Sequence, residues 1–367
     1  MASLYKITMK RSRRTYYLWI PVLVVASALA LSHWHSSRAA VRFFANGLNQ
    51  PRGMAFDDAG NLYVAEAGAP HAQAEDGSSP STNHSSRVLR IAPNRRVTTI
   101  MDGLPFTHYG ADGDAGATDV AVDADALYVL TGEGSDDQLS RALLRMTPRG
   151  TPQRVASLLT VALARTPQAD QMVAGGVPSN PYAMVAAHDG RTFFITDAAL
   201  GSVLSVTLDG SIRVFATLPN MPPLTGLTFG PDGRLYVAMF SSTSPGKSNG
   251  AMWVADPNGH LRLAVARLTL PIDVAFDAAG AMYVLEFSDG RQPYVANSGR
   301  LLRMGQDGAQ TVMLDGLNYP TAMIFSRTGD LYVAVGGAFS AGGQGSILQV
   351  PCQVVTPAAA CLRHAKQ

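Results

Sequence analysis

The sequence contains only two cysteines, Cys352 and Cys361, and both lie close to its C-terminal end. A metal site in this segment would need more ligands than His364 adds to them, so none is indicated. In an oxidising compartment the two thiols are expected to form a short-loop disulfide.

Motifs that identify common enzyme classes are also missing. The sequence has no Walker or Rossmann glycine pattern, no C-x-x-C and no H-E-x-x-H. Ser244 and Lys247 match an S-x-x-K pattern, but they lie in a polar stretch typical of a loop. Residues 112–116 are similar to a calcium-binding loop that lacks its third acidic position and its distal Glu, which favours an ordinary polar turn. No reaction class follows from motifs.

Acidic residues are missing from positions 1–40, and this bias distorts the overall charge. The whole chain has 29 Lys and Arg against 27 Asp and Glu. Taking away the six basic residues of 1–40 leaves 23 against 27, a net charge of −4 for the remainder. Binding to nucleic acid requires a basic stripe, so we expect no nucleic-acid partner.

Residues 1–40 are predicted to be an export signal or an N-terminal membrane anchor. Basic residues at 10–14 precede an apolar run at 16–32, and residues 37–39 carry the small side chains of a cleavage site. The run is short for a membrane span, which takes roughly 20 residues, so a cleaved signal and a retained anchor both stay open. Two adjacent arginines fit a twin-arginine signal, but an ordinary signal is favoured. Either way we expect an extracytoplasmic protein, periplasmic or secreted.

One phrase recurs six times along the chain and predicts the fold. Each copy has a short apolar run, a turn marked by Gly or Asp, and a second run with an aromatic and aliphatic core, which is the pattern of a β-hairpin. The copies lie at residues 51–66, 118–130, 181–197, 224–239, 271–286 and 320–335.

Two further apolar runs follow most hairpins, separated by a polar turn that often contains Gly. Four antiparallel strands in repeats of about 40 to 50 residues are typical of a β-propeller. Segments with helical periodicity are nearly absent, and a solenoid would require parallel strands and capping repeats. The sequence therefore predicts an all-β, six-bladed β-propeller with four antiparallel strands per blade.

The sixth repeat ends after its third strand, whereas a strand-like run at residues 41–48 precedes the first hairpin. This run resembles the fourth strands of the other repeats, so we expect the N-terminal strand to close the last blade. The propeller is predicted to span 41–351 as one domain, followed by a tail, 352–367. Insertions at 67–86 and 157–180 interrupt the period, and the start of the second fits a short helix or a packed loop.

Four phrases resemble those of the ScyD/ScyE family of exported six-bladed propellers. They are GLNQPRGMAF at 47–56, DVAVD at 119–123, SNPY at 179–182 and PIDVAF at 271–276, in the order in which they occur in that family. The resemblance covers residues 41–350 and implies the propeller fold and export. The family is named after the scytonemin pigment gene cluster, which implies a possible role in secondary-metabolite maturation. More distantly, the repeats are similar to NHL repeats and to SMP-30/gluconolactonase and strictosidine synthase propellers.

One candidate site remains, at a mouth of the central channel. The first strand of each blade lines the channel, and antiparallel pairing places its start beside the end of the second strand. Carboxylate and amide oxygens gathered there would suit Ca²⁺. The alternative is that these side chains cap turns or join neighbouring blades. The predicted ligands are Glu66, Asn180, Asp197 and Asp273, with Asp119 and Glu286 as weaker candidates.

These patterns leave two functions open. The favoured one is a binding or scaffold protein that takes a small molecule or a protein at one face of the ring. The alternative is a calcium-dependent, lactonase-like hydrolase, in which a metal in the channel would polarise a carbonyl and activate water. The sequence lacks the E-G-P motif of the SMP-30 group, which counts against the hydrolase. We expect a monomer that meets a membrane only through a retained N-terminal segment.

Overall fold

The computed structural model describes residues 41–69, 81–110, 113–123, 126–134, 138–146, 151–165, 179–241, 249–356 and 361. The predicted export segment, 1–40, lies outside these residues. Contacts group Met1–Arg42 apart from a compact unit, Phe43–Gln367, which carries the propeller. Within the described part of the chain, no helix is long and apolar enough to cross a bilayer.

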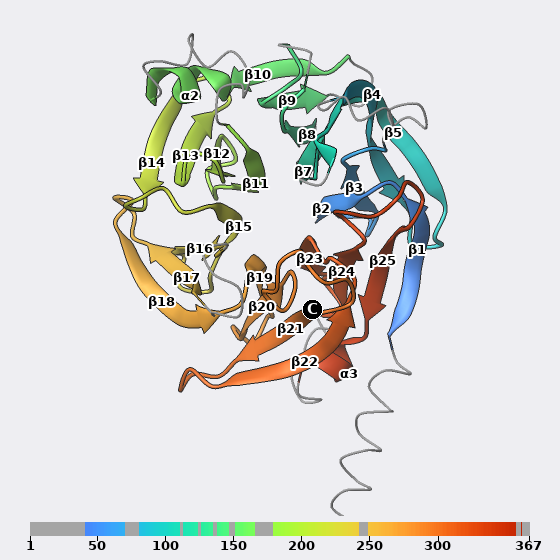
Figure 1. Cartoon of the computed structure of the whole chain (residues 1–367), viewed down its shortest axis with the longest axis vertical. Helices are drawn as coiled ribbons and strands as arrows, with labels where there is room; N and C mark the ends of the chain where they lie inside the picture. The colour runs from blue at the N-terminus through green and yellow to red at the C-terminus, as the bar shows by residue number, and fades with distance from the viewer. Residues whose placement is uncertain are drawn as a thin grey trace, which may run out of the picture. The chain divides into compact units, whose positions relative to one another are not determined.

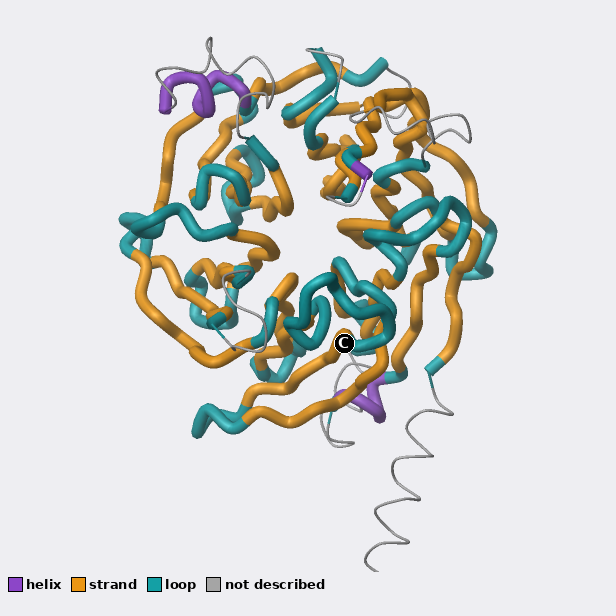
Figure 2. The backbone as a smooth tube through the Cα atoms, viewed as in Figure 1, coloured by secondary structure: helices purple, strands orange, loops and turns teal. Residues whose placement is uncertain are grey.

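Six antiparallel sheets form a ring of blades, as the sequence predicts (Figure 1). The innermost strands of neighbouring blades contact one another all around the ring. Strands make up the blades and loops join their ends (Figure 2). From the innermost strand outward, the blades are β2 Pro51–Phe56, β3 Leu62–Glu66, β4 Ser81–Ile91 and β5 Val97–His108; β7 Ala117–Asp123, β8 Ala126–Thr131, β9 Ala142–Met146 and β10 Gln153–Ser157; β11 Pro181–Ala186, β12 Thr192–Asp197, β13 Ser202–Thr207 and β14 Ile212–Thr217; β15 Leu224–Phe229, β16 Leu235–Met239, β17 Gly250–Ala255 and β18 Leu261–Leu268; β19 Pro271–Phe276, β20 Met282–Glu286, β21 Gly299–Met304 and β22 Gln310–Leu317; and β23 Ala322–Phe325, β24 Leu331–Val335, β25 Gly345–Val350 and β1 Arg42–Leu48.

Strand β1 closes the ring. It pairs with β25 and supplies the outermost strand of blade 6, although the other three strands of that blade come from the far end of the sequence. The predicted closure by the N-terminal strand is confirmed. Because β1 occupies the place of the missing fourth strand, β25 is not left as an open edge.

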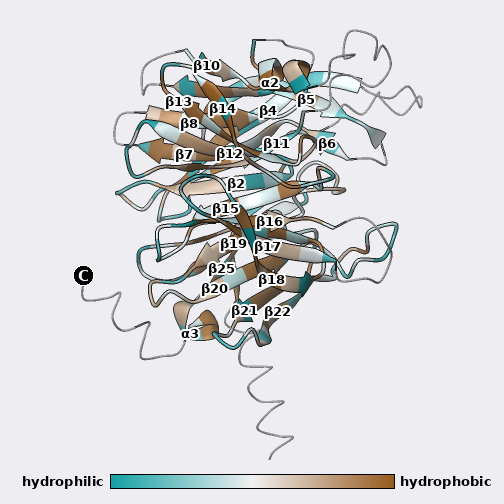
Figure 3. Cartoon of the chain, turned by 90° about the vertical axis from the view of Figure 1, so that its left-hand side faces the viewer, coloured by the Kyte–Doolittle hydropathy of each residue, from teal (hydrophilic) through white to brown (hydrophobic). Residues whose placement is uncertain are grey.

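The hydrophobic core lies between neighbouring blades, and hydrophobic residues are concentrated in the strands (Figure 3). At four of the six junctions, an aromatic ring of the second strand packs edge-to-face on the phenylalanine that ends the innermost strand of the next blade. The repeated phrase therefore encodes a contact between blades as well as a hairpin. The pairs are Phe194 with Phe229, Tyr236 with Phe276, Tyr283 with Phe325, and Tyr332 with Phe56, with ring centroids 4.9 to 5.8 Å apart.

Blade 1 extends further than the sequence indicates. Strand β4 begins at Ser81, inside the predicted insertion, because residues 81–83 pair with residues 106–108 of the lengthened β5. A short strand, β6 Asp114–Ala115, then pairs with the end of β5. This extension brings Asp114 to the central channel. In the second insertion, α2 Leu159–Arg165 confirms the short helix.

The C-terminal tail is attached to two blades. Cys352 and Cys361 form the predicted disulfide, with their Cα atoms 5.7 Å apart. In the short helix α3, Cys352–Val355, the Val355 carbonyl accepts a hydrogen bond from the Tyr283 hydroxyl of blade 5 at 2.5 Å. The backbone N–H of Cys352 donates to Asp330 beside blade 6 at 2.9 Å. The tail thus joins blade 5 to blade 6.

Candidate ligand-binding channel

A channel of about 460 Å³ runs along the axis, and strands from all six blades line it. We call the face at which the innermost strands begin the mouth face. Near it the channel wall is polar, and further in it is apolar. The polar lining residues near the mouth face are Arg52, Asp114, Thr118, Asp119, Asn180, Tyr182, Asp273 and Thr321; further in, the wall includes Met54, Met184, Leu227, Met323, Phe56, Phe276 and Phe325, with Thr228 as a polar residue among them.

One position of the innermost strands repeats the order Gly, Asp, Ala twice around the ring. It is occupied by Gly53, Asp119, Ala183, Gly226, Asp273 and Ala322. In the first half of the ring, Asp119 accepts hydrogen bonds from the backbone N–H of Val120 at 2.8 Å and of Met184, in the next blade, at 2.7 Å. In the second half, Asp273 accepts from Val274 at 2.8 Å and from Met323, in the next blade, at 2.7 Å.

Each of these aspartates requires a glycine at the equivalent position of the preceding blade, because a larger residue would clash with it. A Cβ atom at Gly53 would lie 1.8 Å from Oδ1 of Asp119, and one at Gly226 would lie 2.2 Å from Oδ1 of Asp273. Each carboxyl group is therefore enclosed by the preceding blade and bonded to the following one. We call Asp119 and Asp273 the axial latches, because they join neighbouring blades beside the channel.

Both axial latches are acids of unusually high pKa. Burial raises the pKa of Asp119 to about 8, although its two backbone N–H donors act to lower it. Repulsion by Asp273 adds to the increase. Burial likewise raises the pKa of Asp273 to about 7. At neutral pH the channel is therefore less negative than a count of its aspartates suggests.

The glutamates at the ends of second strands fasten the incoming loops. Oε1 of Glu66 accepts from the backbone N–H of Asn49 at 2.7 Å, and its other oxygen pairs with Arg87. Oε1 of Glu286 accepts from the backbone N–H of Thr269 at 2.6 Å, and its Oε2 accepts from Nε of Arg300 at 2.9 Å. Both side chains are buried.

Asp197 plays the same part in blade 3. Its Oδ1 accepts from the backbone N–H of Asn180 at 2.9 Å, and its Oδ2 accepts from the Ser179 hydroxyl at 2.8 Å. Of the two predicted ligands Asn180 and Asp197, only Asn180 lines the channel.

These contacts show where the predicted calcium ligands lie. The ends of second strands do lie at the mouth face, as predicted, since Pro51 pairs with Glu66 and Pro271 with Glu286. Glu66, Asp197 and Glu286 nevertheless bond to the loops of their own blades. Across the described ranges, no group of three or more His, Cys, Asp or Glu side chains could hold a metal. The calcium site stays a prediction from the sequence.

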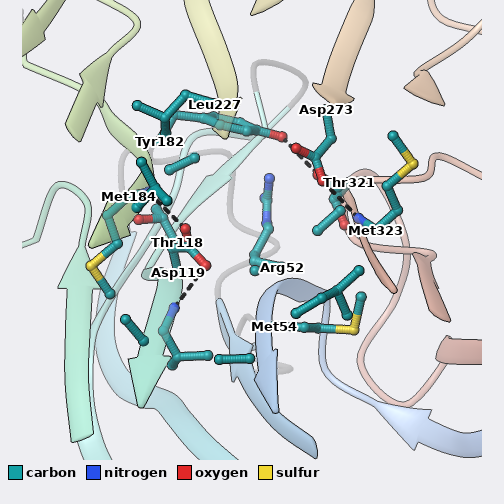
Figure 4. Close-up of a pocket in the computed structure, with 18 of the residues that line it drawn as sticks. Arg52, Met54, Thr118, Asp119, Tyr182, Met184, Leu227, Asp273, Thr321 and Met323 are labelled. Carbon is teal, nitrogen blue, oxygen red and sulfur yellow. Dashed lines mark hydrogen bonds between the residues drawn. The ribbon is translucent and has the colours of Figure 1, made fainter. Parts of the chain in front are cut away.

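Arg52, the second residue of β2, is the side chain that the sequence patterns missed. Its guanidinium group points into the channel between Tyr182, Asp119 and Asp273 (Figure 4). One terminal nitrogen donates to the Asp114 carbonyl at 3.2 Å, and its Nε has no partner. Arg52 takes part in none of the ion pairs found among the described residues. Burial lowers the pKa of this guanidinium, while Tyr182 and Asp114 oppose the shift.

The carboxylate oxygens of Asp114 are bonded to other side chains. One of its oxygens accepts from the Gln50 side chain, and the other lies 2.5 Å from Nδ1 of His108. Its carbonyl, not its carboxylate, contacts Arg52. The guanidinium is therefore left with donor capacity directed at the channel.

A comparison of the six repeats by position would have revealed Arg52. It is the single charged residue at that position of the innermost strands, where the other blades carry Thr118, Tyr182, Thr225, Ile272 and Thr321.

Comparisons with known proteins support the fold class. No protein-family model and no curated protein matches the chain. A gluconolactonase from Xanthomonas campestris is similar in structure, with 16% identity, 85% of this chain and 89% of that chain covered, and a TM-score of 0.53. A protein of unknown function from Bacteroides thetaiotaomicron shares 12% identity over 84% of this chain and 74% of its own, with a TM-score of 0.55. A streptogramin B lyase shares 13% sequence identity, with 85% of this chain and 97% of that chain covered, and a TM-score of 0.50.

Identities this low show the fold alone. The chain is a six-bladed β-propeller similar to NHL and SMP-30-like propellers.

Proposed function

We propose that this protein is a binding propeller whose central channel takes a small molecule by a carboxylate or a similar anionic group. The observation that carries the proposal is the guanidinium of Arg52, which faces the channel without a carboxylate partner.

The physical reason is the free energy of burying a charge. An unpaired charge deep in a protein is costly, and an oppositely charged ligand group removes that cost. A guanidinium presents its donors in a planar fork that matches a carboxylate. The hydroxyl of Tyr182, which donates to the Thr321 carbonyl at 3.3 Å, stands beside the fork as a further polar contact.

The inner part of the channel indicates the rest of the ligand. Its wall is formed by methionine, leucine and phenylalanine side chains, which favour an apolar body. A volume of about 460 Å³ lies within the roughly 300–1,000 Å³ of small-molecule pockets. We therefore propose a ligand with an anionic head and an apolar remainder.

The proposal includes an extracytoplasmic location and a function of the ScyD/ScyE type. The Cys352–Cys361 disulfide supports the location, because such bonds persist in oxidising compartments. The phrases at 47–56 and 271–276 support the family resemblance.

A calcium-dependent, lactonase-like hydrolase is the second candidate, favoured by the structural similarity to a gluconolactonase. Calcium-dependent lactone hydrolysis that is lost in Asp273→Ala, with the fold retained, would favour this candidate over the binding protein.

The binding function predicts that acids bind and that their neutral analogues do not. Calorimetric titration would compare hexanoate and 4-phenylbutanoate with the corresponding primary amides. Arg52→Gln should weaken binding of the acids at least about tenfold, because a hydrogen bond to a charged group is worth about 1.5–3 kcal/mol and 1.4 kcal/mol is tenfold. Arg262→Gln, at an exposed position of the outer strand β18, is the matched control and should bind like wild type. Equal binding of acids and amides, or wild-type affinity in Arg52→Gln, would contradict the proposal.

A further inference from the structure

Five aromatic side chains from three neighbouring blades form one cluster on the mouth face. The nearly buried ring of Phe287 is its centre and contacts the other four, with ring centroids 5.2 to 6.2 Å away. The ring of Phe339 packs on two further members of the cluster and is 40% exposed. We call this cluster the aromatic platform; its members are Phe240, Phe287, Tyr294, Tyr319 and Phe339.

The fold does not require aromatic residues at the positions of Phe240 and Phe287. Phe240 and Phe287 directly follow second strands. Each donates its backbone N–H to the carbonyl of the residue directly before an innermost strand, Pro223 for Phe240 and Leu270 for Phe287. Ala67, Gly132 and Ala198 make the same backbone contact in blades 1 to 3. Small residues thus suffice for the structure, and the aromatic ones are confined to one half of the ring.

The backbone of the platform is held in an unfavourable conformation. Tyr319 and Phe339 have φ values of 40° and 52°, a left-handed region that bulky residues rarely occupy. Such strain costs of order 1–3 kcal/mol, and at Tyr319 it is shared by Gln50 and Leu270, the equivalent residues of blades 1 and 5.

The platform adjoins the channel. A Cβ atom at Gly113 would lie 3.6 Å from the ring of Phe339. The next residue, Asp114, lines the channel and accepts a hydrogen bond from Arg52. Gln50 links the same two loops, because its side chain donates both to Asp114 and to the carbonyl of Ser340 at 3.5 Å. An aromatic surface and an unpaired cation therefore lie at the same mouth.

We infer that the aromatic platform is a subsite for a planar aromatic ring, so that the ligand of the channel is an aryl carboxylic acid. This inference rests on the proposed function, since Arg52 holds the carboxylate. The ring lies against Phe339 in an offset-stacked or edge-to-face arrangement, which favours aromatic over saturated rings beyond the effect of buried area.

The test compares matched acids of increasing length. Phenylacetate, 3-phenylpropanoate, 4-phenylbutanoate and 6-phenylhexanoate are titrated alongside their cyclohexyl counterparts. At least one aryl acid should bind roughly two- to tenfold more tightly than its saturated partner. Phe339→Leu should abolish this preference and keep the binding of cyclohexyl acids. Phe43→Leu, which changes another exposed phenylalanine on the outer strand β1, is the control and should leave the preference intact.

The outcomes separate the two proposals. Equal affinity for aryl and cyclohexyl acids, or a preference that survives in Phe339→Leu, overturns the platform and leaves the channel site standing. Acid binding that does not depend on Arg52, or no binding of any acid in the series, overturns both. Binding only of larger aromatic partners such as peptides, with no small acid bound, assigns the platform to a protein surface and also overturns the inference.

Discussion

Asp119 and Asp273 combine two properties that rarely occur together in a carboxyl group. Each accepts two backbone N–H bonds, which favour its charged form, yet burial dominates and raises its pKa. The two groups stabilise the junctions between blades, but they do so at the cost of a pH-dependent fold. Because their hydrogen-bond partners are backbone N–H groups, we expect their titration to change the free energy of unfolding, with or without a ligand.

The free energy of unfolding is accordingly expected to fall as pH rises from about 5 to 8. The ordinary Asp pKa is 3.8, whereas in the folded protein Asp119 has a pKa of about 8 and Asp273 of about 7. In this window the folded state binds more protons than the unfolded chain, so raising the pH favours unfolding. Melting temperatures measured across the window by circular dichroism would show the slope.

The variant Asp119→Asn removes one of these two titrations and should flatten that slope. It also loses an acceptor for a backbone N–H, so we expect a melting temperature below that of wild type at pH 5. Asp58→Asn, at an exposed carboxylate, is the control for the slope. A wild-type protein that becomes more stable between pH 5 and 8, or an unaltered slope in Asp119→Asn, would show that burial does not govern these groups.

Strand β1 is short, but it contributes strongly to the stability of the ring. Three of its residues, Phe44, Ala45 and Leu48, are buried in the cluster between blades 6 and 1. Burying a large apolar side chain is worth about 1.5–3 kcal/mol, and a domain is stable by only about 5–15 kcal/mol. The strand therefore contributes a large share of the stability and also covers the edge of β25.

A chain that starts at residue 49 should melt far below a chain that starts at residue 41. The exposed edge of β25 should also make the shorter chain aggregate. A synthetic peptide of residues 41–48 added to the shorter chain should restore much of the lost stability, and a scrambled peptide should not. Scanning calorimetry and light scattering measure both effects. Equal melting temperatures of the two chains would contradict closure by β1.

The elements also show how far the sequence could predict this structure. Six hairpins and the closing strand follow from a repeated phrase and from one missing copy of the fourth strand. The extension of blade 1 does not follow, because residues 81–86 are polar and acquire strand structure only through their partner, residues 104–108.

The site could be predicted in position but not in detail. The strand-end acids do lie at the mouth face, as antiparallel pairing requires. Their partners are backbone N–H groups of loops, and nothing in a linear pattern of carboxylates specifies those. Arg52 was missed because one charged residue in a single copy of a repeat resembles ordinary variation.

For the molecule as a whole, the C-terminal tail is a second link between distant parts of the chain in addition to β1, since α3 contacts blades 5 and 6. The double variant Cys352→Ala, Cys361→Ala should lower the free energy of unfolding by no more than about 2–3 kcal/mol, because the disulfide closes a short loop. A reductant should produce a similar loss in wild type and none in the variant, as measured by chemical unfolding. A wild-type protein that is insensitive to reductant would contradict a stabilising role for the disulfide.

The double Gly-Asp-Ala order gives the axis an approximate twofold symmetry, and the functional groups break it. A half-turn exchanges Asp119 with Asp273, but it carries Arg52 onto Thr225 and Tyr182 onto Thr321. A molecule in the channel therefore meets two inequivalent halves. If the proposed anionic ligand binds there, we expect its anionic end to have one position and not two, which predicts both its orientation and a stoichiometry of one ligand per ring.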